Sequence, residues 1–233
     1  MMEIRKSEDR GAVRLSWLDT KHTFSFGDYY DPNHMGWGDL RVINDDIVSA
    51  KGGFGSHPHR DMEIISYMVD GVIEHIDSMG NAEQVKAGEV QRMSAGRGVQ
   101  HSEINPSLTD KLRLIQIWIQ PEAYGLDPDY EQKAFTADDK RGRLLPIVNR
   151  GGADGALHLN QDAALYATIL QDGQEVSHAL GAGRKAWVQV VRGTLTVNGE
   201  RLNEGDGAAL ADVDRVQLTG TETGGEALLF DLK

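Results

Sequence analysis

His57-Pro58-His59, together with His101-Ser102-Glu103 further along the chain, organises this sequence. Each triplet carries two potential metal ligands separated by one residue. On a β-strand alternate side chains leave the same face, so both ligands of a triplet point the same way, a few ångströms apart. If the two strands face one another across a β-barrel, three imidazoles and one carboxylate meet at one point. The spacing therefore indicates either a metal site or a coincidence of polar strand positions.

Short strand-like runs separated by polar turns fill the first half of the chain. Residues 40–48 read as two strands folded at Asn44-Asp45-Asp46. Residues 62–69 and 72–77 are rich in apolar and β-branched side chains, and the Asp70-Gly71 pair between them is a strong hairpin signal. We expect each of these runs to form short antiparallel strands.

Composition extends this pattern to the whole chain. Residues 112–119 are almost continuously apolar, which indicates a strand at the centre of a sheet. Glycine accounts for 27 of the 233 residues and recurs between the short apolar runs, without a helical period. We therefore predict an all-β fold, a sandwich or closed barrel of the jelly-roll kind, with few short helices.

The second half of the chain repeats the rhythm of the first. Residues 186–197 mirror residues 64–76 around a central glycine, and Gly205-Asp206 stands in the place of Gly88-Glu89. Self-similarity of this kind is typical of a duplicated structural unit. The sequence therefore predicts two barrels built on one plan.

The boundary between the two barrels falls in a loop-like region. Residues 121–143 are poor in apolar runs, so we place an N-terminal barrel at residues 1–135 and a C-terminal one at residues 136–233. The second copy has no paired ligands, only the isolated His158 and His178. We expect a degenerate second barrel and a metal site in the first alone.

Charge and composition exclude several classes of function. A net charge of −12 argues against direct binding to nucleic acid, which needs a basic surface. The absence of cysteine leaves only nitrogen and oxygen ligands for a metal. No apolar run is long enough to span a membrane, and the N-terminal residues lack the pattern of a secretory signal. We expect a cytoplasmic protein.

Several motifs together carry a resemblance to a known family. Residues 53–71 and 88–105 resemble the two motifs of cupins, with Ser94 where the general motif has proline. With His22-Thr23-Phe24-Ser25-Phe26 and the Met93-Ser94-Ala95-Gly96-Arg97-Gly98 run, the first half of the chain is similar to the pirin family, and in particular to bacterial members with quercetinase activity. The resemblance implies a bicupin, two cupin-type barrels in one chain.

The resemblance also implies a metal and its ligands. It assigns a divalent metal, Fe(II) first, with manganese, nickel, copper, cobalt or zinc as alternatives, to His57, His59, His101 and Glu103. General cupins use the residue at the place of Glu63 instead of Glu103. Spacing favours Glu103, which shares a strand face with His101, whereas Glu63 lies four residues beyond His59.

For function, the resemblance implies ring-opening dioxygenation of quercetin or a similar flavonol or enol by O2, with Glu103 as general base. Two alternatives stay open: a metal- and redox-dependent regulatory protein that acts through a protein partner, and a cupin chemistry without oxygen, such as isomerisation or hydrolysis. The aromatic segment around His22 reads either as a lid over the core or as part of a substrate pocket. We expect a monomer.

Overall fold

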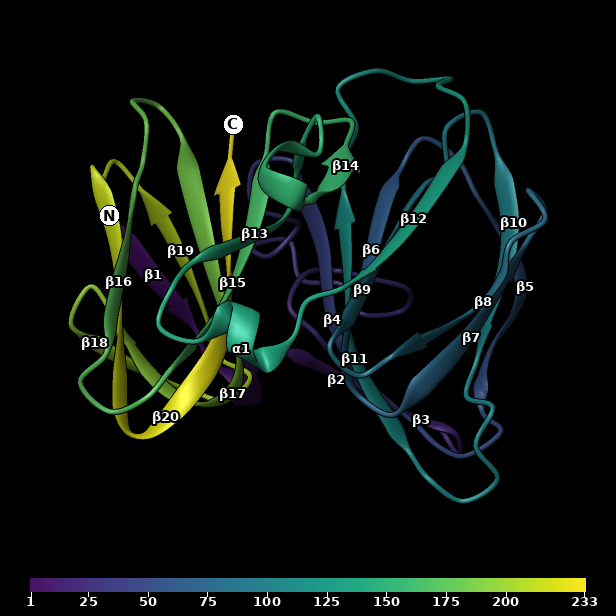
Figure 1. Cartoon of the computed structure of the whole chain (residues 1–233), viewed down its shortest axis with the longest axis horizontal. Helices are drawn as coiled ribbons and strands as arrows, with labels where there is room; N and C mark the ends of the chain where they lie inside the picture. The colour runs from purple at the N-terminus through teal and green to yellow at the C-terminus, as the bar shows by residue number, and fades with distance from the viewer.

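The computed structural model describes all residues, 1–233, as two β units that lie side by side (Figure 1). None of its helices has the length and apolar composition of a membrane span. The helical segments are α1 (Ala137–Lys140) and two short 3-10 helices, Ser7–Asp9 and Ala153–Gly155. The prediction of an all-β fold with few short helices is confirmed.

The first unit is made of two antiparallel sheets that enclose its interior. The larger has seven strands, in the order β12 (Asp129–Ala134), β9 (Glu89–Ser94), β6 (Glu63–Asp70), β11 (Leu112–Ile119), β4 (Leu40–Val48), β3 (Leu18–His22) and β2 (Gly11–Arg14). The smaller has four, in the order β5 (Gly53–His59), β10 (Val99–Ile104), β7 (Val72–Asp77) and β8 (Ala82–Lys86).

Two local predictions for this unit are wrong. Residues 40–48 form one unbroken strand, β4, with no turn at Asn44-Asp45-Asp46. Asp70-Gly71 is a turn but not a hairpin, because β6 and β7 belong to different sheets. Gly71 has a φ of 76°, and a Cβ there would lie 2.8 Å from the Cβ of Leu112. The turn is thus a corner at which the chain crosses between the sheets.

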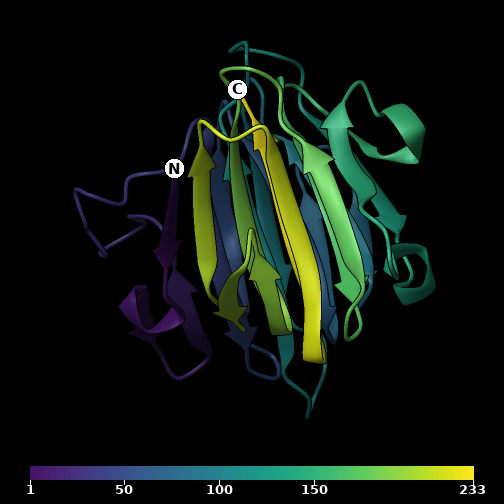
Figure 2. The ribbon, with the colours of Figure 1, turned by 90° about the vertical axis from the view of Figure 1, so that its left-hand side faces the viewer.

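The second unit contains one nine-stranded sheet that folds over on itself (Figure 2). Its strands run in the order β1 (Met2–Arg5), β19 (Gly207–Ala211), β17 (Lys185–Val197), β20 (Arg215–Leu232), β15 (Ala164–Leu170), β13 (Leu145–Arg150) and β14 (Leu157–Leu159), with β16 (Glu175–Ala179) on β20 and β18 (Glu200–Asn203) on β17. The two ends of the long strand β20 pair with different neighbours, β16 and β15.

The N-terminal strand β1 lies in the second unit, where Met2 pairs with Leu210 and Arg5 with Gly207. Figure 1 shows this first segment of the chain beside β19. The chain then crosses to the first unit at β2 and returns at β13. The division into residues 1–135 and 136–233 stays a prediction.

The largest apolar cluster lies between the two units. Side chains of the seven-stranded sheet such as Ile43, Ile65 and Ile117 pack in it with Leu165 and Phe230 of the second unit. The strands of the larger sheet are therefore covered on both faces, which explains the almost unbroken apolar run of β11.

A polar row crosses the interior of the first unit. One apolar cluster, which includes Met68 and Leu114, and another, which includes Ile64 and Met93, occupy this interior. The row is formed by residues that pair successively across five adjacent strands of the larger sheet: His22, Asn44, Gln116, Ser66 and Gln91. A line of polar side chains inside a barrel needs partners, and it marks where the functional site lies.

Candidate metal centre

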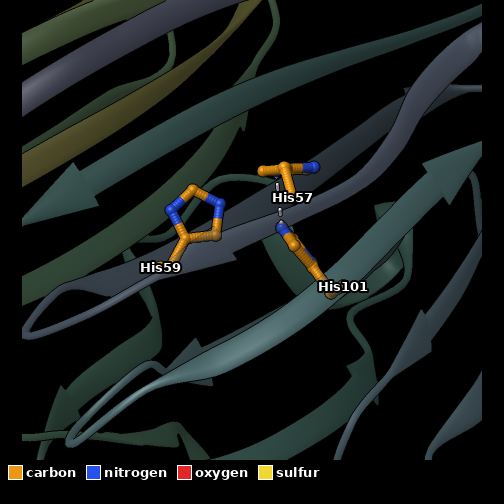
Figure 3. A group of neighbouring side chains, drawn as sticks. All are labelled: His57, His59 and His101. Carbon is orange, nitrogen blue, oxygen red and sulfur yellow. Dashed lines mark hydrogen bonds between the residues drawn. The ribbon is translucent and has the colours of Figure 1, made fainter.

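The two ligand triplets lie on neighbouring strands of the smaller sheet. β5 and β10 pair antiparallel, with His57 opposite His101, and His59 follows two residues along β5. Figure 3 shows the three imidazoles converging from the two strands. The triplets do not face one another across a barrel, because pairing of β5 with β10 within one sheet brings them together.

The three imidazoles are close enough to share one ion. The Nε2 atoms of His57 and His101 are 3.0 Å apart. One ring nitrogen from each of His57, His59 and His101 lies within 4.8 Å of the other two. Since nitrogen ligands bind a divalent ion at roughly 2 Å, nitrogens at this spacing need little movement to reach a common centre.

Hydrogen bonds around the paired rings indicate which nitrogens carry protons. His57 Nδ1 lies 2.7 Å from the Gly55 carbonyl and donates to it, which leaves a lone pair on Nε2. His75 Nε2 donates to Asp77 Oδ2 at 3.0 Å, so His75 Nδ1 accepts from His101 Nδ1 at 3.4 Å. With these assignments, His57 and His101 face each other with unprotonated Nε2 atoms, an arrangement that a shared cation stabilises.

Two of the rings, those of His59 and His101, are neutral at pH 7. Burial, with the neighbouring His57 adding to the effect, lowers the pKa of His59 to about 4 and that of His101 to about 2. Neutral imidazole is the form that binds metals. The residues present therefore fit a divalent ion held by nitrogen and oxygen ligands.

Glu103 lies beside the three imidazoles, buried against the polar row. Its carboxylate accepts hydrogen bonds from Ser66 Oγ at 3.3 Å, from Gln116 Nε2 at 3.1 Å and from Gln91 Nε2. Burial nevertheless raises the pKa of Glu103 to about 7. One carboxylate oxygen lies within 4.8 Å of ring nitrogens of His101 and His75, so His101 belongs to both groups of potential ligands.

Glu63 is engaged elsewhere. Its carboxylate accepts from Ser94 Oγ at 2.9 Å and from the backbone and side-chain amides of Asn160 at 3.3 Å. On β6, Glu63 alternates with Ile64 and shares its face with Ile65, which packs toward the second unit. Glu63 therefore points away from the imidazoles.

His57, His59 and Glu103 line a cavity of about 220 Å³. Its aromatic lining includes Phe54, Phe26 and Trp118, with the Trp118 ring 5.0 Å from that of His59. This cavity is larger than the ~150 Å³ void that binds benzene in an engineered protein core. It can hold a flat aromatic molecule with one edge at the imidazoles.

The remaining histidines of interest have separate surroundings. His22 and Phe26 line the cavity, so these two residues of the aromatic segment form part of a pocket. Phe24, from the same segment, packs in the apolar cluster between the two units. In the second unit His158 Nε2 contacts Asn160 Oδ1 at 2.9 Å, and His178 Nε2 contacts Asp231 Oδ2 at 2.7 Å.

Sequence reasoning missed His75, which supports His101, and the polar row around Glu103. It also took Asn44 and Asp46 for turn residues, although both line the cavity. The available signal was their alternation with Ile43, Asp45 and Ile47, which is that of a strand with one polar face.

Comparison with known proteins shows which family shares this architecture. The sequence profile described as Pirin matches residues 3–119, and one described as the quercetinase C-terminal cupin domain matches residues 147–232. The chain is 48% identical over 232 residues to a quercetin 2,3-dioxygenase of Escherichia coli (strain K12), covering 100% of this chain and 99% of that protein. It is 40% identical over 234 residues to a pirin-like protein of Caulobacter vibrioides, with 99% of each covered.

Among solved structures, the nickel(II) complex of the bacterial pirin YhhW from Escherichia coli superposes with a TM-score of 0.95, at 47% sequence identity, over 100% of this chain and 99% of that one. The match extends over both units, so the family resemblance seen in the motifs of the first half holds for the whole fold. The chain belongs to the pirin family.

Proposed function

We propose that this protein is a metal-dependent dioxygenase that opens the ring of quercetin or a similar flavonol with O2. The observation that carries the proposal is the convergence of His57, His59 and His101, with the Nε2 atoms of His57 and His101 3.0 Å apart, near a buried carboxylate that lines an aromatic cavity. The quercetin 2,3-dioxygenase name of the Escherichia coli relative supports it.

Four side chains would hold the metal: His57, His59, His101 and Glu103. We propose Fe(II) as the resident ion, and the existence of a nickel(II) complex of the related pirin supports the binding of a divalent ion. When bound, the ion would supply positive charge that stabilises a deprotonated substrate hydroxyl and, if redox-active, the electron-transfer capacity that reaction with O2 requires.

Glu103 is the proposed general base. Its carboxylate lines the cavity, within reach of a bound substrate, and an ionised carboxylate there can take up the proton of a substrate hydroxyl. Hydrogen bonds from Gln116 and Ser66 hold the carboxylate in place while it does so. Side chains that donate hydrogen bonds to a ligating carboxylate fix its orientation.

The cavity walls orient the substrate. Phe26 and Trp118 contact edge to face, with ring centroids 5.3 Å apart, and Phe54 lies on the side of His57. These rings exclude water and favour a planar aromatic molecule over a flexible polar one. The reacting hydroxyl would then lie at the imidazole end, within reach of Glu103.

The test begins with metal analysis of protein purified without oxygen, alongside His101→Ala. We expect bound metal in the natural protein and loss of most of it in the variant, while His178→Ala, in the second unit, keeps the metal. Quercetin turnover by the iron-loaded protein is then compared with and without O2. Product formed without O2 would favour a Lewis-acid cupin chemistry, and no turnover of any enol or polyphenol would favour a regulatory binding protein.

A further inference from the structure

The cavity has a second polar end. From the larger sheet, β3 contributes His22, and β4 contributes Asn44 and Asp46, to its lining, whereas the three imidazoles of the metal centre lie on the smaller sheet. All three side chains are at least nine-tenths buried, with 6%, 3% and 2% of their surfaces exposed. His22 and Asn44 pair directly across the two strands, and Asp46 follows two residues further on the same face.

Two of these groups lack a partner. The buried atoms His22 Nδ1 and Asn44 Oδ1 form no hydrogen bond within the protein. Both belong to the polar row, whose other three members, Gln116, Ser66 and Gln91, all bond to Glu103. Since buried polar atoms are nearly always paired, the two unpaired members of the row indicate that something else supplies the missing partners.

Aromatic side chains connect the two ends. The ring of His22 lies 5.2 Å from that of Phe26, Phe26 lies 5.3 Å from Trp118, and Trp118 lies 5.0 Å from His59. These contacts form a continuous aromatic wall from the distal groups to the imidazoles. A planar molecule lying along this wall has one edge at His59 and the other near His22.

We propose that His22, Asn44 and Asp46 form a distal subsite that hydrogen-bonds a second oxygen group, a phenolic hydroxyl or a ring carbonyl, of a flat aromatic substrate. The proposal rests on the proposed function for the reacting end of that substrate. It makes the preferred substrate a polyhydroxylated flavonol rather than one that carries only the two oxygens needed at the metal.

The chemistry of the subsite suits a phenol. Burial, with Arg10 nearby, lowers the pKa of His22 to about 4, so its ring is neutral at pH 7 and offers one donor and one acceptor. The amide of Asn44 also provides both. A phenolic hydroxyl, which donates and accepts, satisfies such groups, whereas an apolar ring edge leaves them unpaired.

The experiment compares the binding of quercetin with that of 3-hydroxyflavone, which keeps the 3-hydroxyl and 4-carbonyl but lacks the other hydroxyls. Dissociation constants are measured without oxygen, by calorimetry on nickel-loaded protein. The variants are His22→Phe and Asn44→Leu. The control is Thr168→Val, which removes another buried, unpartnered polar atom, Oγ1 on β15 in the second unit.

The natural protein is expected to prefer quercetin, and each variant to lower that preference by about fivefold while leaving the affinity for 3-hydroxyflavone unchanged. Thr168→Val should keep the full preference. Because neither variant removes a hydrogen bond of His22 Nδ1 or Asn44 Oδ1 within the protein, both should melt no earlier than the natural protein. Should one fail to fold, the other still decides.

An unchanged preference in the folded variants would overturn the subsite, as would an equal loss of affinity for both compounds. The outcome is separate from that of the dioxygenase proposal. If quercetin is bound with a preference that the variants lower but is never oxidised, the subsite stands and the dioxygenase proposal falls. If quercetin is oxidised and the preference does not change, the dioxygenase proposal stands and the subsite falls. If neither compound binds, both proposals are contradicted.

Discussion

His75 lies behind His101, with 3.4 Å between the two Nδ1 atoms, and its other nitrogen lies 3.0 Å from Asp77. Asp77 in turn accepts from Asn81 Nδ2 at 2.8 Å. A buried carboxylate thus reaches His101 through an intervening imidazole. This chain fixes the orientation of His101 and leaves its Nε2 free for a metal.

Replacing His75 by Phe should therefore weaken metal binding without removing a proposed ligand. Phenylalanine keeps the ring that stacks on Tyr130 but cannot accept from His101. We expect a loss of about 10- to 100-fold in metal affinity, measured by competition with a chromophoric chelator. His158→Phe, in the second unit, serves as the control. Equal affinity in His75→Phe and the natural protein would show that the chain does not support the site.

Glu103→Gln and Glu63→Gln separate the two carboxylates. Glu103→Gln should keep some metal yet lower kcat by at least ~100-fold, because the amide cannot take up a proton. Glu63→Gln should keep both metal and turnover, since Glu63 bonds to Ser94 and Asn160 instead. Metal content and steady-state oxygen uptake are the measurements. An unchanged kcat in Glu103→Gln would remove the base assignment, and metal loss in Glu63→Gln would restore the general cupin pattern.

The free energy of unfolding of the metal-free protein should depend on pH through the protonation of Asp46. Burial raises the pKa of Asp46 from an ordinary value of 3.8 to about 7. Between these values the folded protein binds the proton more tightly than the unfolded chain, so this contribution to the free energy of unfolding is present below pH 4 and is lost as the pH rises through 7.

Asp46→Asn removes that dependence. Urea unfolding of the metal-free variant and the natural protein is compared at pH 5 and pH 8. The stability of the variant relative to the natural protein should be greater at pH 8 than at pH 5, by a few kcal/mol at most. The buried imidazoles of His59 and His101 contribute an opposite pH dependence in both proteins, so it cancels in the comparison. A difference that does not vary with pH would contradict the prediction.

A buried ion pair holds the two units together. Lys140 Nζ donates to Tyr67 Oη at 2.5 Å and to Glu226 Oε1 at 2.6 Å. Lys140→Met leaves the Glu226 carboxylate with only Arg192, whose Nε lies 3.9 Å away, and we expect a loss of about 3 kcal/mol in the free energy of unfolding. Arg201→Met breaks the exposed pair with Glu222 and should cost less than ~1 kcal/mol. Equal effects of the two changes would mean that the buried pair contributes no more than the exposed one.

The sequence allowed prediction of the features that depend on local spacing. The two-residue separation within each triplet was sufficient to bring His57 and His59 to one face, and likewise His101 and Glu103. The pairing of β5 with β10 could not be predicted, because it depends on contacts between strands far apart in the chain. The same reason hid His75, whose strand pairs with the other edge of β10.

The direction in which the side chains of β6 point could not be predicted, because both faces of this strand are buried. Glu63, Ile64 and Ile65 are all buried, since one face of β6 packs in the first unit and the other against the second. Alternation of polar and apolar residues then no longer shows which face is the interior. Asn44 and Asp46 were misread for a related reason, because polar residues inside a strand look like a turn until the cavity that they line is known.

The central claim is that this protein inserts dioxygen into a flavonol. The most direct measurement is mass spectrometry of the product formed by iron-loaded protein from quercetin under isotopically labelled O2. A dioxygenase should give a ring-opened product that carries both labelled oxygen atoms. A ring-opened product without label, or with oxygen from water, would contradict it.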